Sequence, residues 1–130
     1  MAVGDVFLFV TTHAKGHDKR EKLHIFLGTT DHFRAPAEYA FLFISSANYD
    51  QCFPISFADY GEFLKYDSFI SCGNLVFYSA DELKEISPKK VGSISHAHLG
   101  KLREHLADHE VMVGWQITVV CEAIDKLPSA

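Results

Sequence analysis

Lys65 and Asp67 stand two positions apart at mid-chain, in the segment Lys65-Tyr66-Asp67. If this segment is extended, both side chains point to the same face, because side chains alternate along a strand. A carboxylate can accept a proton from an attacking hydroxyl, while an ammonium group stabilises the charge that develops around phosphorus. The pair therefore suits phosphoester cleavage, with an ordinary surface ion pair as the alternative interpretation.

A long polar loop near the start of the chain offers a second group of reactive side chains. The stretch from Thr11 to Glu21, TTHAKGHDKRE, contains Lys15, His17, Lys19 and Arg20. Cationic donors can bind a phosphodiester, and an imidazole moves protons near neutral pH. Loops of this length often bind ligands, although many charged loops are only solvated surface.

Ser45 and Ser46 offer hydroxyl groups at the end of an apolar run, YAFLFIS. Strand ends often contact ligands, although serines there can also simply end the strand. Neither serine stands in a G-x-S-x-G motif, so the sequence disfavours a serine hydrolase.

The elements that must position these residues are mostly strands. Runs rich in Val, Ile, Leu and Phe predict strands at Asp5 to Val10, Lys22 to Gly28 and Tyr39 to Ser45, and the first two should pair. Shorter strands are expected at Cys52 to Phe57, Ser68 to Cys72 and Leu75 to Tyr78. Gly73-Asn74 is expected to form a tight turn between the last two.

The spacing of apolar residues changes from that of strands to that of a helix from Ser95 onward. Ser95 is a helix N-cap candidate, and Leu99, Leu102 and Leu106 follow helical spacing. The tail Gly114 to Asp125 fits a strand or a helix, and we expect a helix. Strands first and helices last predict one α+β, mainly β domain over residues 1–130. Its antiparallel barrel should cover about residues 4–80 and its C-terminal helical part about residues 94–127.

Three histidines, His98, His105 and His109, fall in a narrow arc beside the leucine stripe. Three imidazoles can bind Zn²⁺, which would make the chain a His-rich metal-binding module. No carboxylate clearly completes the set, so we assign no metal ligand. Stoichiometric zinc retained after dialysis would identify such a module.

Composition restricts the class of protein further. The chain has 130 residues, 48% hydrophobic and 22% charged, which excludes an intrinsically disordered protein. Its 12 Lys and Arg against 17 Asp and Glu give a net charge of −5, so any nucleic-acid site must be local. Three widely spaced cysteines, no basic leader and no apolar run of roughly 20 residues predict a cytoplasmic protein without a membrane span.

Several of these features, in this order, resemble the PemK/MazF toxin family. They are Gly4-Asp5, the Gly16-His17 loop, the strand ending in Ser45-Ser46, Lys65-Tyr66-Asp67-Ser68, and Gly92-Ser93-Ile94-Ser95 opening a helix. The likeness covers roughly residues 4–108. It implies an SH3-like barrel with a packed C-terminal helix and a homodimer. It also implies cleavage of single-stranded RNA without metal or other cofactor, and neutralisation by a cognate antitoxin protein.

The resemblance also implies catalytic residues. His17 matches the loop histidine of some members, and Lys65-x-Asp67 matches an Arg-x-Asp pair, with Lys in place of Arg. Asp67 would then take the proton from a 2′-hydroxyl, whose oxygen attacks the adjacent phosphate. Lys65 or His17 would assist departure of the 5′-oxygen.

Substrate-binding residues are implied in the same way. Lys22, or Arg20 just upstream, stands where the family has a basic residue before a Pro, which is Leu23 here. Ser46 or Ser45 matches the family's strand-end Thr. The alternative function is a non-catalytic protein on the same fold that acts through a protein partner.

Overall fold

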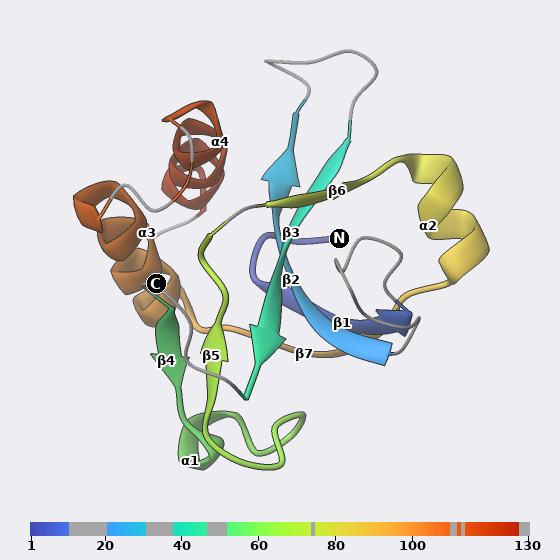
Figure 1. The fold of residues 1–130 in the computed structure, drawn as a ribbon, viewed down its shortest axis with the longest axis horizontal. Coiled ribbons are helices and arrows are strands. Elements are labelled where there is room, and N and C mark those ends of the chain that lie inside the picture. Colours follow the sequence, from blue (N-terminus) through green and yellow to red (C-terminus); the bar gives the residue numbers. More distant parts are fainter. Residues whose placement is uncertain are drawn as a thin grey trace.

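The computed structural model describes residues 1–10, 21–30, 38–46, 52–73, 75–109, 112 and 114–127. Within them, seven strands form one antiparallel sheet in the order β4-β5-β3-β2-β1-β7, with β6 paired to β3 beside this path (Figure 1). The strands are β1 (Asp5–Val10), β2 (Glu21–Thr29), β3 (Tyr39–Ser45), β4 (Phe53–Ile55), β5 (Ser68–Ile70), β6 (Val76–Tyr78) and β7 (Lys89–Ser93). The helices are α1 (Phe57–Tyr60), α2 (Ala80–Ile86), α3 (His96–His109) and α4 (Gly114–Asp125).

The central strands β1, β2 and β3 are buried on both faces, which explains their nearly continuous apolar sequences. On β2, Ile25 and Leu27 join a cluster that includes the leucines of α3. Phe26, from the alternate positions of the same strand, joins a second cluster with Phe41 and Tyr78. The alternation of side chains therefore supplies two separate hydrophobic cores.

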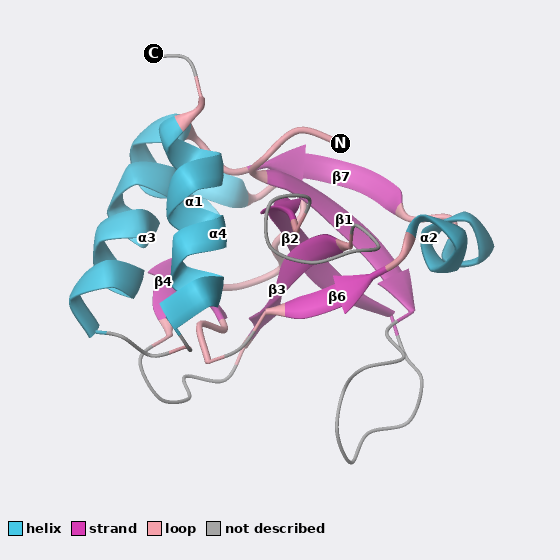
Figure 2. Cartoon of the chain, turned by 90° about the horizontal axis from the view of Figure 1, so that it is seen from above, coloured by secondary structure: helices cyan, strands magenta, loops and turns pink. Residues whose placement is uncertain are grey.

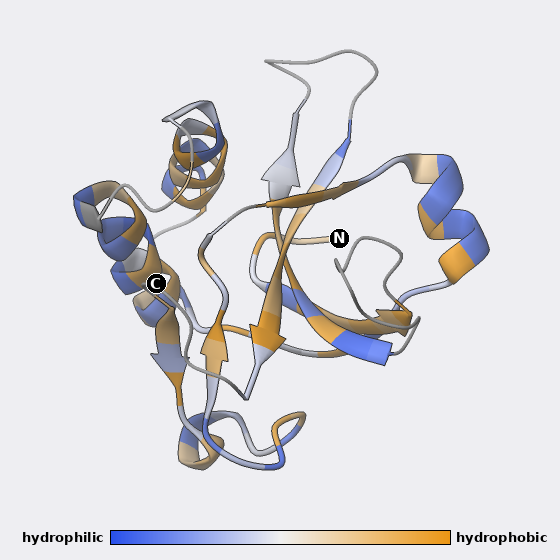
Figure 3. Cartoon of the chain, viewed as in Figure 1, coloured by the Kyte–Doolittle hydropathy of each residue, from blue (hydrophilic) through white to orange (hydrophobic). Residues whose placement is uncertain are grey.

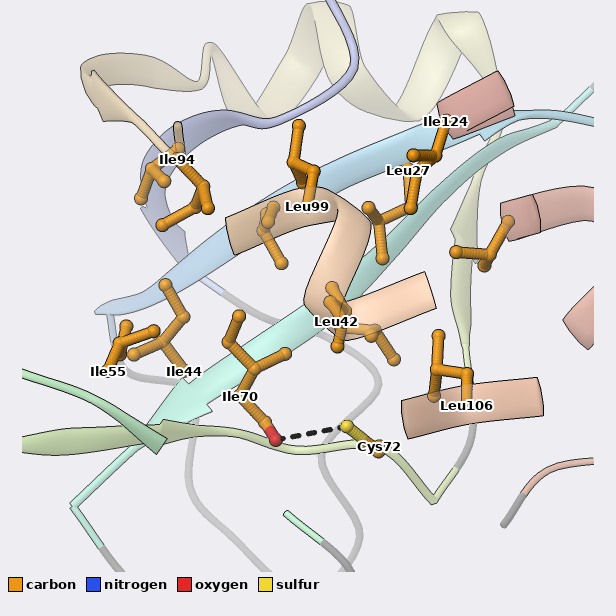
Figure 4. Packing of buried hydrophobic residues seen from close by; sticks show 14 of the residues in the cluster. Leu27, Leu42, Ile44, Ile55, Ile70, Cys72, Ile94, Leu99, Leu106 and Ile124 are labelled. Carbon is orange, nitrogen blue, oxygen red and sulfur yellow. Dashed lines mark hydrogen bonds between the residues drawn. The ribbon is translucent and has the colours of Figure 1, made fainter. Parts of the chain in front are cut away.

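Helices α3 and α4 cover one face of the curled sheet, while β6 and α2 lie toward the other (Figure 2). The close-up in Figure 4 shows Leu99 and Leu106 of α3 directed toward Leu27 and Leu42 of the sheet. Figure 3 shows that β6 and the end of β3 are hydrophobic, whereas most residues of α2 are hydrophilic. None of the described helices is long and apolar enough to cross a membrane.

A bulge in β2 brings α4 close to the sheet. The register of the β2 and β3 pair shifts between Phe26 and Thr29, and Gly28 has a φ of 110°. A Cβ atom on Gly28 would lie 2.9 Å from the Cβ of Ala123 on α4. Glycine is therefore needed here both for the backbone conformation and for the helix contact.

The predicted α+β class, with a barrel-like antiparallel sheet and C-terminal helices, is confirmed. The predicted strands Asp5 to Val10 and Tyr39 to Ser45 have the observed bounds, and the first two strands pair as expected. The helix after Ser95 is α3, and the ambiguous tail is the helix α4. Helices and strands contribute similar numbers of residues.

The tight turn expected at Gly73-Asn74 includes Asn74, which lies outside the described residues, and the strands on either side of it, β5 and β6, do not pair with each other. β5 pairs with the end of β3 at Ile44 and Ser45, whereas β6 pairs with its start at Tyr39 to Phe41. Because β3 is seven residues long, its two ends can accept two different short strands.

The structure contains three elements that the sequence reasoning missed: α1, α2 and β7. Helix α1 begins at Phe57, so the strand expected at Cys52 to Phe57 is limited to β4. Helix α2 has a capping box, in which Ser79 and Glu82 exchange side-chain and backbone hydrogen bonds. The Ser-x-x-Glu spacing is the sequence pattern that could have predicted the start of α2. β7 pairs with β1, so the sheet continues past residue 80.

Candidate functional site

A pocket of about 530 Å³ lies where the start of β2 meets the end of β3. The turn that follows α1 forms its other wall. Its apolar and aromatic lining consists of Leu8, Leu23, Ile44, Phe63, Leu64, Tyr66 and Val91, and its polar lining comes from Glu21, Lys22, Ser45, Ser46, Glu62, Lys65 and Ser68. Four residues predicted from the sequence, Lys22, Ser45, Ser46 and Lys65, therefore share one pocket.

The antiparallel pairing of β2 with β3 explains how Lys22 reaches the serines. Leu23 pairs with Ile44, so Lys22 and Ser45 come next at the same end of the two strands. The Lys22 ammonium lies 5.2 Å from the ring centroid of Phe43, at cation–π distance. Phe43 does not line the pocket, so this contact directs the ammonium group toward the side of the sheet where Phe43 lies.

A buried histidine, which the sequence analysis did not single out, contacts the backbone of Lys22. His24 is fully buried, and its ring stacks on Phe9 with centroids 3.8 Å apart. Its Nδ1 lies 2.8 Å from the carbonyl oxygen of Lys22. Because a carbonyl oxygen only accepts, Nδ1 carries the proton and donates it. The polar residue inside the apolar run KLHIFLG was the sequence signal for this role.

Asp67 lies in a different pocket from Lys65. Its Oδ1 accepts a hydrogen bond from the backbone N–H of Phe57, at 2.9 Å, next to the start of α1. It lines a smaller pocket of about 330 Å³ together with Ser56, Asp59 and His98. The segment Lys65-Tyr66-Asp67 is a bend before β5, so the extended backbone that would put both side chains on one face is not present.

The two pockets nevertheless adjoin, because Ser68 lines both of them. The carboxylates that share the larger pocket with Lys65 are Glu21 and Glu62 among the described residues. His17 and Arg20 lie in the stretch 11–20, outside the described residues. The structure therefore brings four of the seven predicted site residues together in the larger pocket. A fifth, Asp67, lines the adjoining smaller pocket.

The histidines of α3 have other partners. Nδ1 of His98 is in hydrogen-bond contact with the hydroxyl of Tyr60, which also accepts from the backbone N–H of Ser95. The ring of His105 packs against Phe53. The side chain of His109 lies outside the described part of the chain. Across the described ranges, no three His, Cys, Asp or Glu side chains are grouped as metal ligands.

Gly92 on β7 makes room for one wall of the larger pocket. A Cβ atom there would lie 2.6 Å from Cδ1 of Phe63 and 2.9 Å from Oε1 of Glu62. We expect Gly92→Ala to displace this wall and to lower the free energy of unfolding by about 1–3 kcal/mol, as overpacking does. Urea denaturation followed by circular dichroism measures the change.

Gly100→Ala is the matched control for Gly92→Ala. Nothing lies within 4 Å of a Cβ built on Gly100, which is inside α3. Alanine is a better helix former than glycine, so this variant should be more stable by up to about 1 kcal/mol. A Gly92→Ala protein as stable as the wild type would show that the wall moves without strain.

No family model matches the chain, and no curated protein matches it.

Proposed function

We propose that the chain is a metal-independent endoribonuclease that cuts single-stranded RNA, as the toxin component of a toxin–antitoxin system. The observation that carries the proposal is the pocket shared by Lys22, Ser45, Ser46 and Lys65. Two lysines and two serines line one cavity, and ammonium and hydroxyl groups are suited to binding a phosphodiester. The homodimer and the antitoxin partner belong to the same proposal, through the resemblance to PemK/MazF proteins.

The charge of the pocket suits one phosphate better than a long polyanion. Lys22 and Lys65 are accompanied by Glu21 and Glu62, and the whole chain has a net charge of −5. Duplex binding relies on many phosphate contacts, which this surface does not offer among its described residues. A single-stranded substrate can instead place one phosphate beside Lys65 in the pocket.

The proposed reaction is attack of a ribose 2′-oxygen on the adjacent phosphorus. A carboxylate takes the 2′-hydroxyl proton, the new 2′-O–P bond forms, and the P–O5′ bond breaks. The 5′-oxygen leaves with a proton from Lys65 or His17. The products are a 2′,3′-cyclic phosphate and a 5′-hydroxyl. The nucleophile belongs to the substrate and is already beside the phosphate, so no external nucleophile has to be generated.

Incubation of the full chain with a mixed-sequence RNA in EDTA tests the proposal. We expect fragments with 2′,3′-cyclic phosphate ends, and a loss of cleavage in the Lys65→Ala, Asp67→Ala double variant. The control is Lys84→Ala, which removes an exposed lysine of α2 that does not line the pocket. Equal cleavage by the double variant and the wild type would show that Lys65 and Asp67 do not form the active site.

The carboxylate that takes the proton can be identified by single variants. Asp67→Asn keeps the size of the side chain in the smaller pocket, and Glu62→Gln does so in the larger pocket. We expect Asp67→Asn to abolish cleavage if the substrate reaches across Ser68. Full activity of Asp67→Asn with loss in Glu62→Gln would assign the proton transfer to Glu62.

One observation favours the alternative, a non-catalytic protein that acts through a protein partner. Asp67 is engaged by the N–H of Phe57 and lines a different pocket from Lys65. Expression in a bacterial host separates the two functions. Decay of RNA supports the ribonuclease, whereas DNA breaks without RNA decay support action on a protein partner.

A further inference from the structure

Tyr66 is an exposed aromatic residue on the wall of the larger pocket. Its exposed fraction is 58%, and it follows Lys65 directly in the chain. Tyrosine joins a flat apolar ring to a polar hydroxyl group and is enriched at interfaces, so its position in the lining of a polar pocket makes the ring available to a ligand. We propose that the ring of Tyr66 stacks on one nucleobase of the RNA strand whose phosphate Lys65 contacts. This inference rests on the proposed ribonuclease function.

The backbone on both sides of Tyr66 is anchored in the protein interior. Leu64 is 4% exposed, and its N–H donates to the carbonyl oxygen of Tyr60 at 2.9 Å. Ser68 is 5% exposed, and its Oγ donates to the carbonyl oxygen of Tyr66 at 3.0 Å. These contacts fix the backbone that carries the ring, which reduces the entropy that a ligand would have to remove.

The neighbouring charges favour a nucleotide as the occupant. A nucleotide presents a phosphate and a flat base next to each other, and Lys65 and Tyr66 present an ammonium group and an aromatic ring next to each other. Stacking uses the face of any base, so the contact does not require the many cations that an acidic protein lacks. A phosphate contact from Lys65 then sets the position of the stacked base.

Phe57 provides a matched comparison on the same side of the molecule. It is 48% exposed at the start of α1, yet it lines neither the larger nor the smaller pocket. If exposure of an aromatic ring were sufficient for RNA binding, Phe57 would contribute as much as Tyr66. Only the ring of Tyr66, beside Lys65, is expected to contribute to RNA binding.

The test measures the Kd of the full chain for a fluorescein-labelled, 2′-O-methyl oligonucleotide of mixed sequence, which binds without being cut. We expect Tyr66→Ala to raise the Kd about 5- to 150-fold, the range for loss of one stacked base. Tyr66→Phe retains the ring, and Phe57→Ala removes the other exposed ring. Both should stay within about twofold of the wild type, since neither removes the stacking contact.

A second probe separates stacking from other effects of the tyrosine. An oligonucleotide of the same length without bases should bind equally to the wild type and to Tyr66→Ala. Tyr66→Leu, which keeps an apolar side chain without an aromatic ring, should behave as Tyr66→Ala does and serves if the alanine variant fails to fold.

The possible failures are distinguishable. If the wild type binds and cuts RNA but Tyr66→Ala has an unchanged Kd, the stacking proposal is wrong and the ribonuclease stands. If Tyr66→Ala weakens binding of the probe without bases as much as it weakens binding of the oligonucleotide with bases, the stacking proposal is also wrong. If the wild type neither binds nor cuts RNA, the proposed function fails, and the role of Tyr66 in RNA binding fails with it.

Discussion

Leu102→Ala should lower the free energy of unfolding by about 2–5 kcal/mol, the usual cost of emptying a fully buried leucine site. Leu102 is completely buried on α3, between Leu99 and Leu106, which are also completely buried. These leucines belong to the larger core, together with Val6 and Ile25 of the sheet. The cavity would open where α3 packs on the sheet.

Urea denaturation followed by circular dichroism measures this loss, as a shift of the midpoint at a constant slope. Lys101→Ala is the matched control, because Lys101 is the exposed neighbour of Leu102 on the same helix. It should change stability by no more than about 0.5 kcal/mol. Equal effects of the two variants would contradict the packing of α3 described above.

The second large effect concerns the buried thiol of Cys72 and alkaline pH. The pKa of Cys72 is raised to about 12, mainly by burial; a backbone hydrogen bond at Phe53 opposes this shift, and the nearby Cys52 adds to it. The Sγ–H of Cys72 donates to the carbonyl oxygen of Ile70 at 3.3 Å (Figure 4). The ordinary pKa of a cysteine thiol is 9.0.

Between pH 9 and pH 12 the unfolded chain therefore loses the Cys72 proton while the folded chain retains it. The raised folded-state pKa stabilises the protein below pH 9, and this contribution is lost as the pH rises towards 12. We expect stability to fall by about 1.4 kcal/mol per pH unit through this window, and by at most about 4 kcal/mol.

Urea denaturation at several pH values from 8 to 12 measures the slope in the wild type and in Cys72→Ala, with the range set by the pKa values above. The alanine variant has a lower stability throughout, so the slope is the quantity compared. We expect a shallower slope in Cys72→Ala, because this variant lacks the thiol whose pKa differs between the folded and unfolded chain. Cys121→Ala, which keeps Cys72, should retain most of the wild-type slope. Identical slopes in all three proteins would rule out the buried thiol as the cause.

Part of the candidate site could be predicted from the sequence. The apolar runs that end at Ser45 and begin near Lys22 are long enough to identify two strands, and the structure shows that they pair so that these two ends meet. Lys65 was chosen by its neighbours in the sequence, and it also lines this pocket. The role of His24 was missed, because a histidine inside a strand does not reveal what its Nδ1 contacts.

The sequence by itself determined the local periods: alternating and continuous apolar strands in the first half, and the leucine stripe of α3 in the second. These patterns are local, because each follows from the geometry of a single element. Only the tertiary structure decided that β5 and β6 share β3, and that Lys65 and Asp67 line adjoining pockets. The hydrogen bond from the Phe57 N–H to Asp67 joins residues ten positions apart across the turn after α1, a contact that the spacing of residues 65–67 alone does not reveal.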